Sequence, residues 1–319
     1  MKRILVTGAG GFVGQALVRR LCSPEAGLGF DSLTVVDVAL DESHLPRHAA
    51  LRVLRGSITD EAVRAQALRD APDLVFHLAA ITSGQAESDF ALGLAVNLQG
   101  SLALYEALRA QGNCPRLVQT SSIGVFGLPL PAHIDDRTPI VPTLSYGAHK
   151  HALEIVLADY SRRGWIDGRS PRLPGIVTRP GLPNGARSAF ASDLIRELAQ
   201  GREYDCPVDA EGTLWLLSLP ACVDALLHAA RIDAAALPPT RAWTLPSVRA
   251  SVAEIVAALM RRHGVGVSGR IRYAPDPTLI PQFARWPTLE TAVARALGFV
   301  ADPSLDELLD RANAGLLPG

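Results

Sequence analysis

The chain has 319 residues, of which 48% are hydrophobic and 20% are charged, and its formal net charge is −1. This composition suits a folded protein with a well-buried core and excludes wholesale disorder. Because the charge is nearly balanced, bulk attraction to nucleic acid or to an anionic membrane is excluded, and an anionic substrate must be bound by local groups. No apolar run approaches the roughly 18 residues of a membrane span.

The cysteines and the N-terminal residues carry no metal-binding or targeting pattern. The short apolar run over residues 4–6 is followed at once by glycines, which predicts a buried strand rather than a signal segment. We expect reduced thiols in a cytoplasmic protein with no metal site, because no C-x-x-C spacing connects the four cysteines, Cys22, Cys114, Cys206 and Cys222.

The first half of the chain alternates short apolar runs with amphipathic segments. The amphipathic segments predict helices over residues 12–22, 61–69 and 89–110. The apolar runs predict strands over residues 3–7, 33–38, 51–54, 74–78 and 117–121. This order predicts a Rossmann-type α/β fold, with a doubly wound parallel sheet covered by helices on both faces.

The second half predicts a smaller, mixed α/β cap. A proline-containing loop over residues 124–144 leads into a helix over 146–163, and residues 176–178 predict one more strand of the main sheet. After Pro180 the alternation stops, and helical patterns at 192–200, 221–232 and 252–263 mix with short strands. We predict a nucleotide-binding domain over residues 1–180 and mainly a substrate cap over 181–319, with the helix near 221–232 returning to the first domain.

A glycine-rich turn follows the first predicted strand and opens the first helix. Such a turn lets the backbone approach a pyrophosphate and presents free N–H groups at a helix N-terminus. We therefore predict dinucleotide binding by the turn residues Gly8, Gly11, Phe12, Val13 and Gly14.

Asp37 ends the second predicted strand, 23 residues after Gly14. A carboxylate at this position accepts hydrogen bonds from the adenosine ribose and repels a 2′-phosphate. No arginine occurs among the next residues, so the sequence favours NAD over NADP. A plain turn aspartate at a strand end is the alternative.

Ser122, Tyr146 and Lys150 carry the predicted chemistry. Ser122 lies 24 residues before Tyr146, and Lys150 follows the tyrosine by one helical turn. Together with the glycine turn, this set resembles the extended branch of the short-chain dehydrogenase/reductase family. The resemblance implies a tyrosine base for the substrate hydroxyl, a serine that binds the same oxygen, and a lysine that holds the nicotinamide ribose. A free tyrosine has a pKa near ~10, which the ammonium and the positive nicotinamide are expected to lower.

The resemblance also implies further cofactor contacts. Ser57 stands where the family usually has an aspartate that contacts adenine, so the Ile58 backbone is left to read the adenine edge, and Asp60 is expected to cap the next helix. His77 is expected to be a structural residue at a strand end. Other cofactor positions implied are Leu78, Ala79, Ala80, Asn97, Tyr146, Lys150 and Pro180.

For the substrate, we expect a polar loop beginning at Thr82 and Ser83 to face Ser122 and Tyr146. Arg187 or Ser192 in the cap would then bind a carboxylate, because arginine grips that group with two parallel hydrogen bonds. A solvated surface arginine is the alternative for Arg187.

Several segments resemble one subgroup of the family, the D-erythronate dehydrogenases: residues 83–90, 159–164, 206–209 and 214–218. The subgroup implies NAD-dependent oxidation of a small sugar acid at C2 to the 2-keto acid. Leu182 departs from its pattern, because a lysine is expected there. The alternatives are a nucleotide-sugar epimerase or dehydratase with tightly held NAD, and a catalytically silent NAD(P) sensor, against which the intact Ser122, Tyr146 and Lys150 argue.

The resemblance finally implies a homodimer through a four-helix bundle formed by the helices over 89–110 and 146–163. These helices carry apolar residues on more than one face: Leu98, Leu102, Tyr105, Ile155 and Leu157. Burial of these residues against the subunit's own sheet is the alternative.

Overall fold

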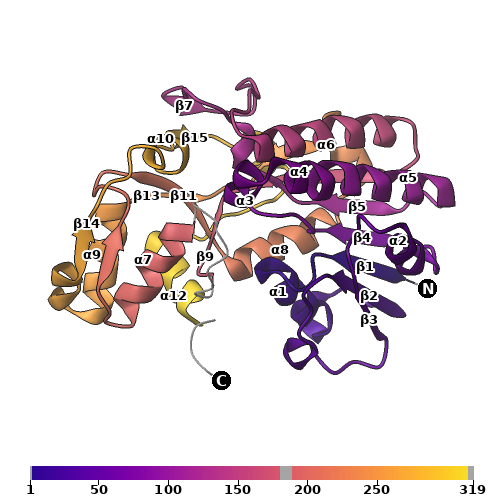
Figure 1. Ribbon diagram of the computed structural model, residues 1–319, viewed down its shortest axis with the longest axis horizontal. Helices are drawn as coiled ribbons and strands as arrows, with labels where there is room; N and C mark the ends of the chain where they lie inside the picture. The colour runs from indigo at the N-terminus through magenta and orange to yellow at the C-terminus, as the bar shows by residue number, and fades with distance from the viewer. Residues whose placement is uncertain (1, 180–188, 315–319) are drawn as a thin grey trace.

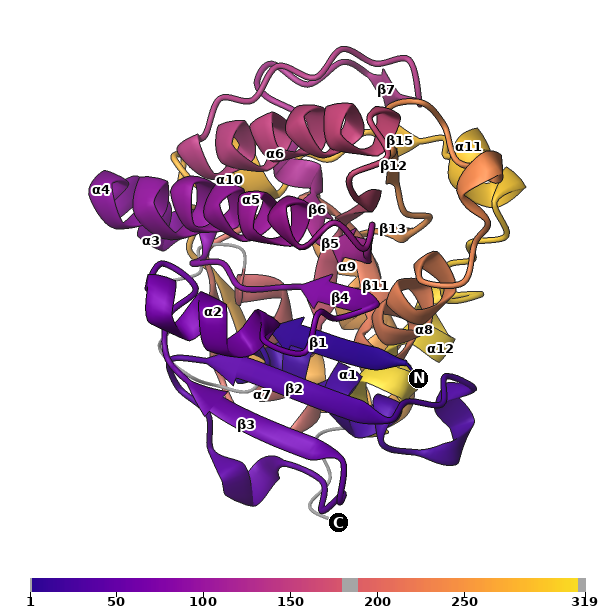
Figure 2. The same cartoon turned by 90° about the vertical axis from the view of Figure 1, so that its right-hand side faces the viewer.

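The computed structural model describes residues 2–179 and 189–314. Its central sheet is parallel throughout and has the strand order β3-β2-β1-β4-β5-β8-β12, with the short strand β6 (Ser121–Ser122) also paired to β8. The sheet strands are β1 (Arg3–Thr7), β2 (Ser32–Asp37), β3 (Leu51–Arg55), β4 (Leu74–His77), β5 (Arg116–Gln119), β8 (Asp167–Leu173) and β12 (Ala242–Thr244). Figure 2 shows β3, β2, β1, β4 and β5 side by side in this order. The predicted doubly wound sheet is confirmed.

Helices cover both faces of this sheet (Figure 1). One face carries α1 (Phe12–Leu21) and α8 (Leu219–Ala229), and the other carries α2 (Glu61–Leu68), α5 (Ser101–Gln111) and α6 (Ser145–Arg162). Successive strand residues point to opposite faces. Ile4 and Val6 accordingly belong to the cluster formed with α1 and α8, whereas Leu5 belongs to the cluster formed with α5 and α6.

The helical stretch after β4 begins earlier than the sequence indicated. Helix α3 (Ser83–Ser88) occupies the predicted polar loop, because the Thr82 hydroxyl caps it by accepting a hydrogen bond from the Gln85 N–H. The predicted long helix then follows as α4 (Phe90–Gly93), a π-helical segment (Leu94–Gly100) and α5.

The prediction for residues 176–178 was wrong. Strand β9 (Gly175–Val177) pairs with β11 (Thr213–Ser218) in a separate small sheet, and the position in the main sheet belongs to β8. The sequence of β8, DGRSPRL, has almost no apolar residues. Its buried Arg169 is accommodated because the guanidinium donates to the carbonyl oxygens of Asp167 at 2.8 Å and Ile232 at 2.9 Å.

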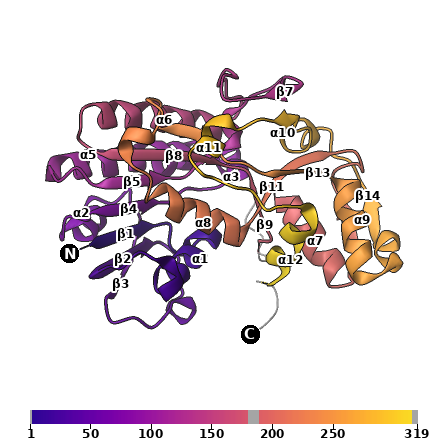
Figure 3. The same cartoon turned by 180° about the vertical axis from the view of Figure 1, so that it is seen from behind.

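The smaller lobe has its own apolar core around β9, β11 and β13 (Val248–Ser251). Figure 3 shows these three strands from behind. Its other elements are α7 (Phe190–Ala199), α9 (Val252–His263), α12 (Leu305–Ala314) and the paired strands β10 (Tyr204–Cys206) and β14 (Ile271–Tyr273). Between β11 and β13 the chain returns to the main sheet as α8 and β12.

An aromatic junction joins the proline-containing loop to the smaller lobe. Within it, β7 (His133–Ile134) pairs with β15 (Thr288–Leu289) near the short helices α10 (Ile280–Phe283) and α11 (Ala292–Ala296). The ring centroids of Trp215 and Trp286 are 4.7 Å apart, and Phe126 packs edge-on against Trp215. This cluster is buried and forms one wall of the cavity described below.

The described part of the chain has no helix with the length and apolarity required to cross a membrane.

Candidate active site

The glycine-rich turn lies against the end of β4, and the close approach requires glycine. Gly8 has φ +75°, and a Cβ on it would come within 2.5 Å of the Ala79 nitrogen. A Cβ on Gly14 would lie 2.1 Å from the Gly8 carbonyl oxygen. Helix α1 starts at Phe12 with no side-chain cap at Gly11 and no acidic residue in its first turn. Its N-terminal N–H groups therefore favour an anion such as a diphosphate.

Asp37 lies beside this turn at the carboxyl end of β2. Its carboxylate accepts hydrogen bonds from the backbone N–H of Gly10 at 2.9 Å and of Ala39 at 3.1 Å. A Cβ on Gly10 would come within 2.2 Å of the Ala39 carbonyl oxygen, so the turn and the strand end are held together closely. The glycine cradle, the uncapped helix terminus and this carboxylate fit an adenine dinucleotide.

The segment after β3 carries the residues expected near adenine. Ser57 shares a 2.8 Å hydrogen bond with the Thr59 hydroxyl and accepts one from the Thr59 N–H at 3.2 Å. Ile58 is 5% exposed. Asp60 caps α2 by accepting from the Ala62 N–H at 2.8 Å, as predicted. The adenine contacts of Ser57 and Ile58 stay predictions.

Two buried side chains fix the backbone at the end of β4. Asn97 accepts from the Ile81 N–H at 2.8 Å and donates to the Ile81 carbonyl oxygen at 3.2 Å, so it holds the backbone that follows β4. His77 contacts the hydroxyls of Thr7 at 2.6 Å and Ser101 at 2.8 Å. Burial lowers the pKa of His77 to about 3, so it is neutral and structural.

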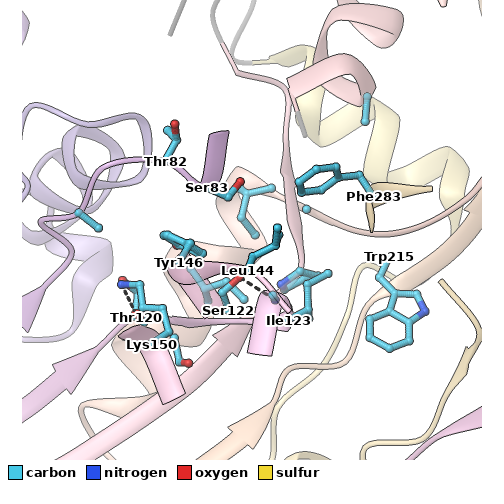
Figure 4. Close-up of a pocket in the computed structure, with 18 of the residues that line it drawn as sticks. Thr82, Ser83, Thr120, Ser122, Ile123, Leu144, Tyr146, Lys150, Trp215 and Phe283 are labelled. Carbon is cyan, nitrogen blue, oxygen red and sulfur yellow. Dashed lines mark hydrogen bonds between the residues drawn. The ribbon is translucent and has the colours of Figure 1, made fainter. Parts of the chain in front are cut away.

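The structure brings Ser122, Tyr146 and Lys150 together at one cavity (Figure 4). The Lys150 ammonium donates to the Thr120 carbonyl oxygen at 2.8 Å and lies 5.6 Å from the centroid of the Tyr146 ring. Ser122 accepts from the Gly124 N–H at 3.0 Å. Its own hydroxyl hydrogen is free for the tyrosine or a substrate oxygen.

The electrostatics differ from the expectation for Tyr146. Burial raises its pKa, while the Arg179 charge and the Ser122 hydroxyl oppose the shift. Burial also lowers the pKa of Lys150 to about 8, against the opposing charge of Glu154. Both shifts follow from desolvation, which disfavours phenolate and ammonium alike. The protein alone therefore does not lower the tyrosine pKa, and a bound positive nicotinamide has to contribute to that.

A buried ion pair lies beneath this set, and the sequence reasoning did not identify it. Glu154, one turn after Lys150 on α6, is 3% exposed and accepts from the Arg172 guanidinium at 2.9 and 2.8 Å. The Ser121 hydroxyl donates to the same carboxylate. Burial works to raise the pKa of Glu154, but hydrogen bonds from His151, Arg172 and Ser121 together hold it below its usual value. The Glu154 carboxylate thus links Arg172 of β8 to Ser121, which precedes Ser122 in β6.

The cavity has a volume of about 370 Å³ and runs from the glycine turn to the aromatic junction. The predicted cofactor residues that line it are Gly8, Gly11, Phe12, Val13, Gly14, Leu78, Ala80, Tyr146 and Lys150. Absent from the lining that the described residues form are Asp37, Ser57, Ile58, Ala79 and Asn97. Thr82 and Ser83 line it on the side of α3. On the other side of Tyr146 lie Phe283 and Trp215, as Figure 4 shows.

Ser192 is not brought to this cavity. It is 2% exposed and is absent from the lining that the described residues form, although its neighbours Phe190 and Ala191 belong to that lining. Each step along a helix turns the side chain by roughly 100°, which separates neighbouring residues of α7. Pro180, Leu182 and Arg187 lie outside the described residues.

Comparisons with known proteins agree with this site. The chain is 41% identical over 314 residues, which cover 96% of each chain, to the D-erythronate dehydrogenase of Cupriavidus necator. It is 31% identical to the D-erythronate dehydrogenase of Haemophilus influenzae, over 97% of this chain and 98% of that one. The solved structure of a nucleoside-diphosphate-sugar epimerase from Agrobacterium tumefaciens matches with a TM-score of 0.90 and 36% identity, over 97% of this chain and 92% of that one.

The family assignment rests on a match that spans the glycine turn and the positions of Ser122, Tyr146 and Lys150. Residues 4–233, which include all of these positions, match the model of an NAD-binding family. The match confirms the resemblance drawn from the motifs. The chain therefore belongs to the NAD dependent epimerase/dehydratase family.

Proposed function

We propose that this enzyme is an NAD-dependent dehydrogenase that oxidises a small sugar acid, D-erythronate or a close relative, at C2 to the 2-keto acid. The observation that carries the proposal is the charge of the cavity beside Tyr146. Its described lining contains Lys150 and Arg179 and no aspartate or glutamate. Such a lining favours an anionic substrate, and the relatives at 41% and 31% identity are named for a sugar acid.

Each residue of the proposed catalytic set has a separate task. NAD, when bound, accepts the hydride from the carbon that is oxidised. Tyr146 removes the proton of the hydroxyl on that carbon, and Ser122 donates a hydrogen bond to the same oxygen. Lys150, anchored by the Thr120 carbonyl at 2.8 Å, stabilises the phenolate and holds the nicotinamide ribose. Asp37 would select NAD, and Asn97 would keep the chain over the cofactor in place.

A nucleotide-sugar epimerase is the second candidate, favoured by the Agrobacterium tumefaciens structure at 36% identity. An epimerase returns the hydride to its substrate, so NADH does not accumulate. The cavity of about 370 Å³ includes residues of the glycine turn, so cofactor and substrate share it.

A substrate screen separates these candidates. Purified enzyme and NAD are mixed with four-carbon sugar acids or with nucleotide sugars, and NADH absorbance is followed. The proposal expects NADH to accumulate with D-erythronate or a stereoisomer and not with nucleotide sugars. Epimerised nucleotide sugar without NADH would establish the second candidate, and NAD binding without turnover of any substrate would favour a sensor.

We also propose a cytoplasmic homodimer, with a nucleotide domain over residues 1–180 and mainly a substrate cap over 181–319. Phe90 on α4 and Ile155 on α6, helices that pack against each other, are 58% and 59% exposed and offer an apolar surface. Tyr105 and Leu157 cannot contribute to it as predicted, because both are fully buried within the subunit. The described cysteines are all free thiols, which suits a reducing compartment.

A further inference from the structure

Arg179 follows β9 and lines the same cavity as Ser122 and Tyr146. Of the described lining residues, it and Lys150 are the two that carry charge. The Lys150 ammonium is already directed to the Thr120 carbonyl oxygen at 2.8 Å. Because the proposed function assigns Lys150 to Tyr146 and to the nicotinamide ribose, Arg179 is the cation left for the substrate.

Among the described residues, the guanidinium of Arg179 forms no salt bridge, although the charge of Asp193 also acts on it. The nearby cation Arg196 is different, because it is paired with Asp193 at 2.6 Å and Glu197 at 3.0 Å. Arg196 instead fixes the Arg179 backbone by donating to its carbonyl oxygen at 3.0 Å. A cation removed from water without a partner is costly, and an anionic ligand would offset that cost.

Arg179 and Tyr146 act on each other electrostatically. The Arg179 charge opposes the rise in the pKa of Tyr146, and burial lowers the pKa of Arg179 while the Tyr146 phenol opposes that change. Both side chains also line the same cavity. In a 2-hydroxy acid the carboxylate carbon is bonded directly to the carbon that bears the reacting hydroxyl. A cation that binds this carboxylate has to share the cavity with the base, and Arg179 lines the same cavity as Tyr146 and acts on its charge.

The far wall of the cavity is unsuited to a carboxylate. It consists mainly of the aromatic side chains Phe126, Trp215, Phe283 and Trp286. The Trp215 indole N–H is directed to the Pro287 carbonyl oxygen at 2.8 Å, so it does not serve the cavity. An acid bound with its carboxylate there would lose hydration without gaining charged partners.

We infer that the Arg179 guanidinium binds the carboxylate of the substrate and so places its C2 hydroxyl against Tyr146 and Ser122. This inference rests on the proposed function, since it assigns the clamp for that substrate. Arginine suits the task because its planar guanidinium can donate two parallel hydrogen bonds to a carboxylate. The diphosphate of the cofactor is another anion with related chemistry, and the test has to distinguish the two.

The test compares Arg179→Gln and Arg179→Lys with Arg202→Gln, which alters an exposed arginine of the same lobe that is paired with Glu197. Enzyme saturated with NADH is titrated with D-erythronate by calorimetry, and NADH itself is titrated by fluorescence. A charged hydrogen-bonded pair predicts a loss of D-erythronate affinity of about 10- to 100-fold in Arg179→Gln and a smaller loss in Arg179→Lys. NADH affinity is expected to stay within about threefold, and Arg202→Gln should match the unmodified enzyme.

Two outcomes would overturn the inference: unchanged D-erythronate affinity in Arg179→Gln, or NADH affinity that falls as much as acid affinity, which would assign Arg179 to the diphosphate. Melting curves show whether each variant is folded. If Arg179→Gln does not fold, Arg179→Lys, which keeps the positive charge, takes its place. The calorimetric titration measures binding of the acid and does not require the enzyme to oxidise it. If Arg179→Gln oxidises the acid with an unchanged KM, the assignment of Arg179 is refuted and the proposed function stands. If the unmodified enzyme binds the acid through Arg179 but does not oxidise it, the proposed reaction is refuted and the assignment of Arg179 stands.

Discussion

The ammonium of Lys150 lies 5.6 Å from the centroid of the Tyr146 ring, one helical turn away on α6. The Thr120 carbonyl oxygen holds it there through a 2.8 Å hydrogen bond, and Lys150 is only 4% exposed. Burial of the ammonium is unfavourable in the free protein, and its charge becomes useful only when a proton has to leave the phenol of Tyr146. The buried ammonium therefore lowers the stability of the folded protein and serves the proton transfer.

This cost predicts a specific pH dependence. Burial lowers the pKa of Lys150 from 10.5 to about 8, so above pH 8 the folded protein binds fewer protons than the unfolded chain. Stability then rises with pH until the unfolded lysine also loses its proton. Relative to Lys150→Met, the unmodified protein should gain about 3 kcal/mol of unfolding free energy between these two pKa values. Urea unfolding of both proteins from about pH 7 to pH 10 measures the difference, and a constant difference would contradict the buried ammonium.

We expect Asn97 to be essential for activity, although its side-chain hydrogen bonds go to the backbone of Ile81. Asn97→Ala removes both hydrogen bonds to Ile81, which leaves buried backbone groups unpaired and costs about 1–3 kcal/mol of unfolding free energy. We expect kcat/KM to fall at least about tenfold, because the residues after Ile81 line the cavity. Asn113→Ala is the matched control, since that exposed amide also donates to a backbone carbonyl, that of Pro72 at 3.0 Å. Equal effects of the two substitutions would show that Asn97 has no special role.

Asp37 should determine the choice of cofactor. Its carboxylate is held beside the glycine turn by the Gly10 and Ala39 N–H groups, where it would repel a 2′-phosphate. NAD should be preferred to NADP, and Asp37→Ala should reduce that preference about tenfold or more. Asp41→Ala, four residues further on and exposed, should leave it unchanged. Ratios of kcat/KM for the two cofactors provide the measurement, and equal use of both by the unmodified enzyme would refute the assignment.

The exposed apolar surface on α4 and α6 predicts how subunits associate. Ile155→Glu places a charge at the centre of the proposed four-helix bundle and should produce monomers, as measured by light scattering at micromolar concentrations. Val300→Glu is a suitable control, because Val300 is 76% exposed and lies elsewhere in the chain. A monomeric unmodified protein would rule the bundle out.

The sequence predicted the parts of the fold in which local pattern and tertiary role agree. The glycine turn, the apolar strands β1, β2 and β4, and the pair Tyr146 and Lys150 on one helix all have short-range signals. Strand β8 has none, because Arg169, Ser170 and Pro171 give a polar run whose burial depends on partners distant in sequence, such as the Ile232 carbonyl.

The site residues that the sequence did not predict also depend on partners distant in the chain. The Glu154 carboxylate meets Arg172 only because α6 packs on β8, and a single glutamate in a helix gives no sign of this. Arg179 gives no sequence signal for a substrate contact, and only the structure shows that it lines the same cavity as Tyr146. Ser192 has the right chemistry for a substrate contact but sits on a buried part of α7.

The role of Tyr146 as the base is tested most directly by NADH formation from NAD and D-erythronate. The measurement compares the unmodified enzyme with Tyr146→Phe. The substitution removes the phenol proton and little volume, so the account predicts a fall in kcat of about 10²- to 10⁴-fold, with NADH affinity within about threefold of the unmodified value. Tyr160→Phe removes a hydroxyl from the same helix, α6, that donates to Glu106 of α5 at the surface, and this variant should turn over normally. Near-normal turnover by Tyr146→Phe would contradict the account.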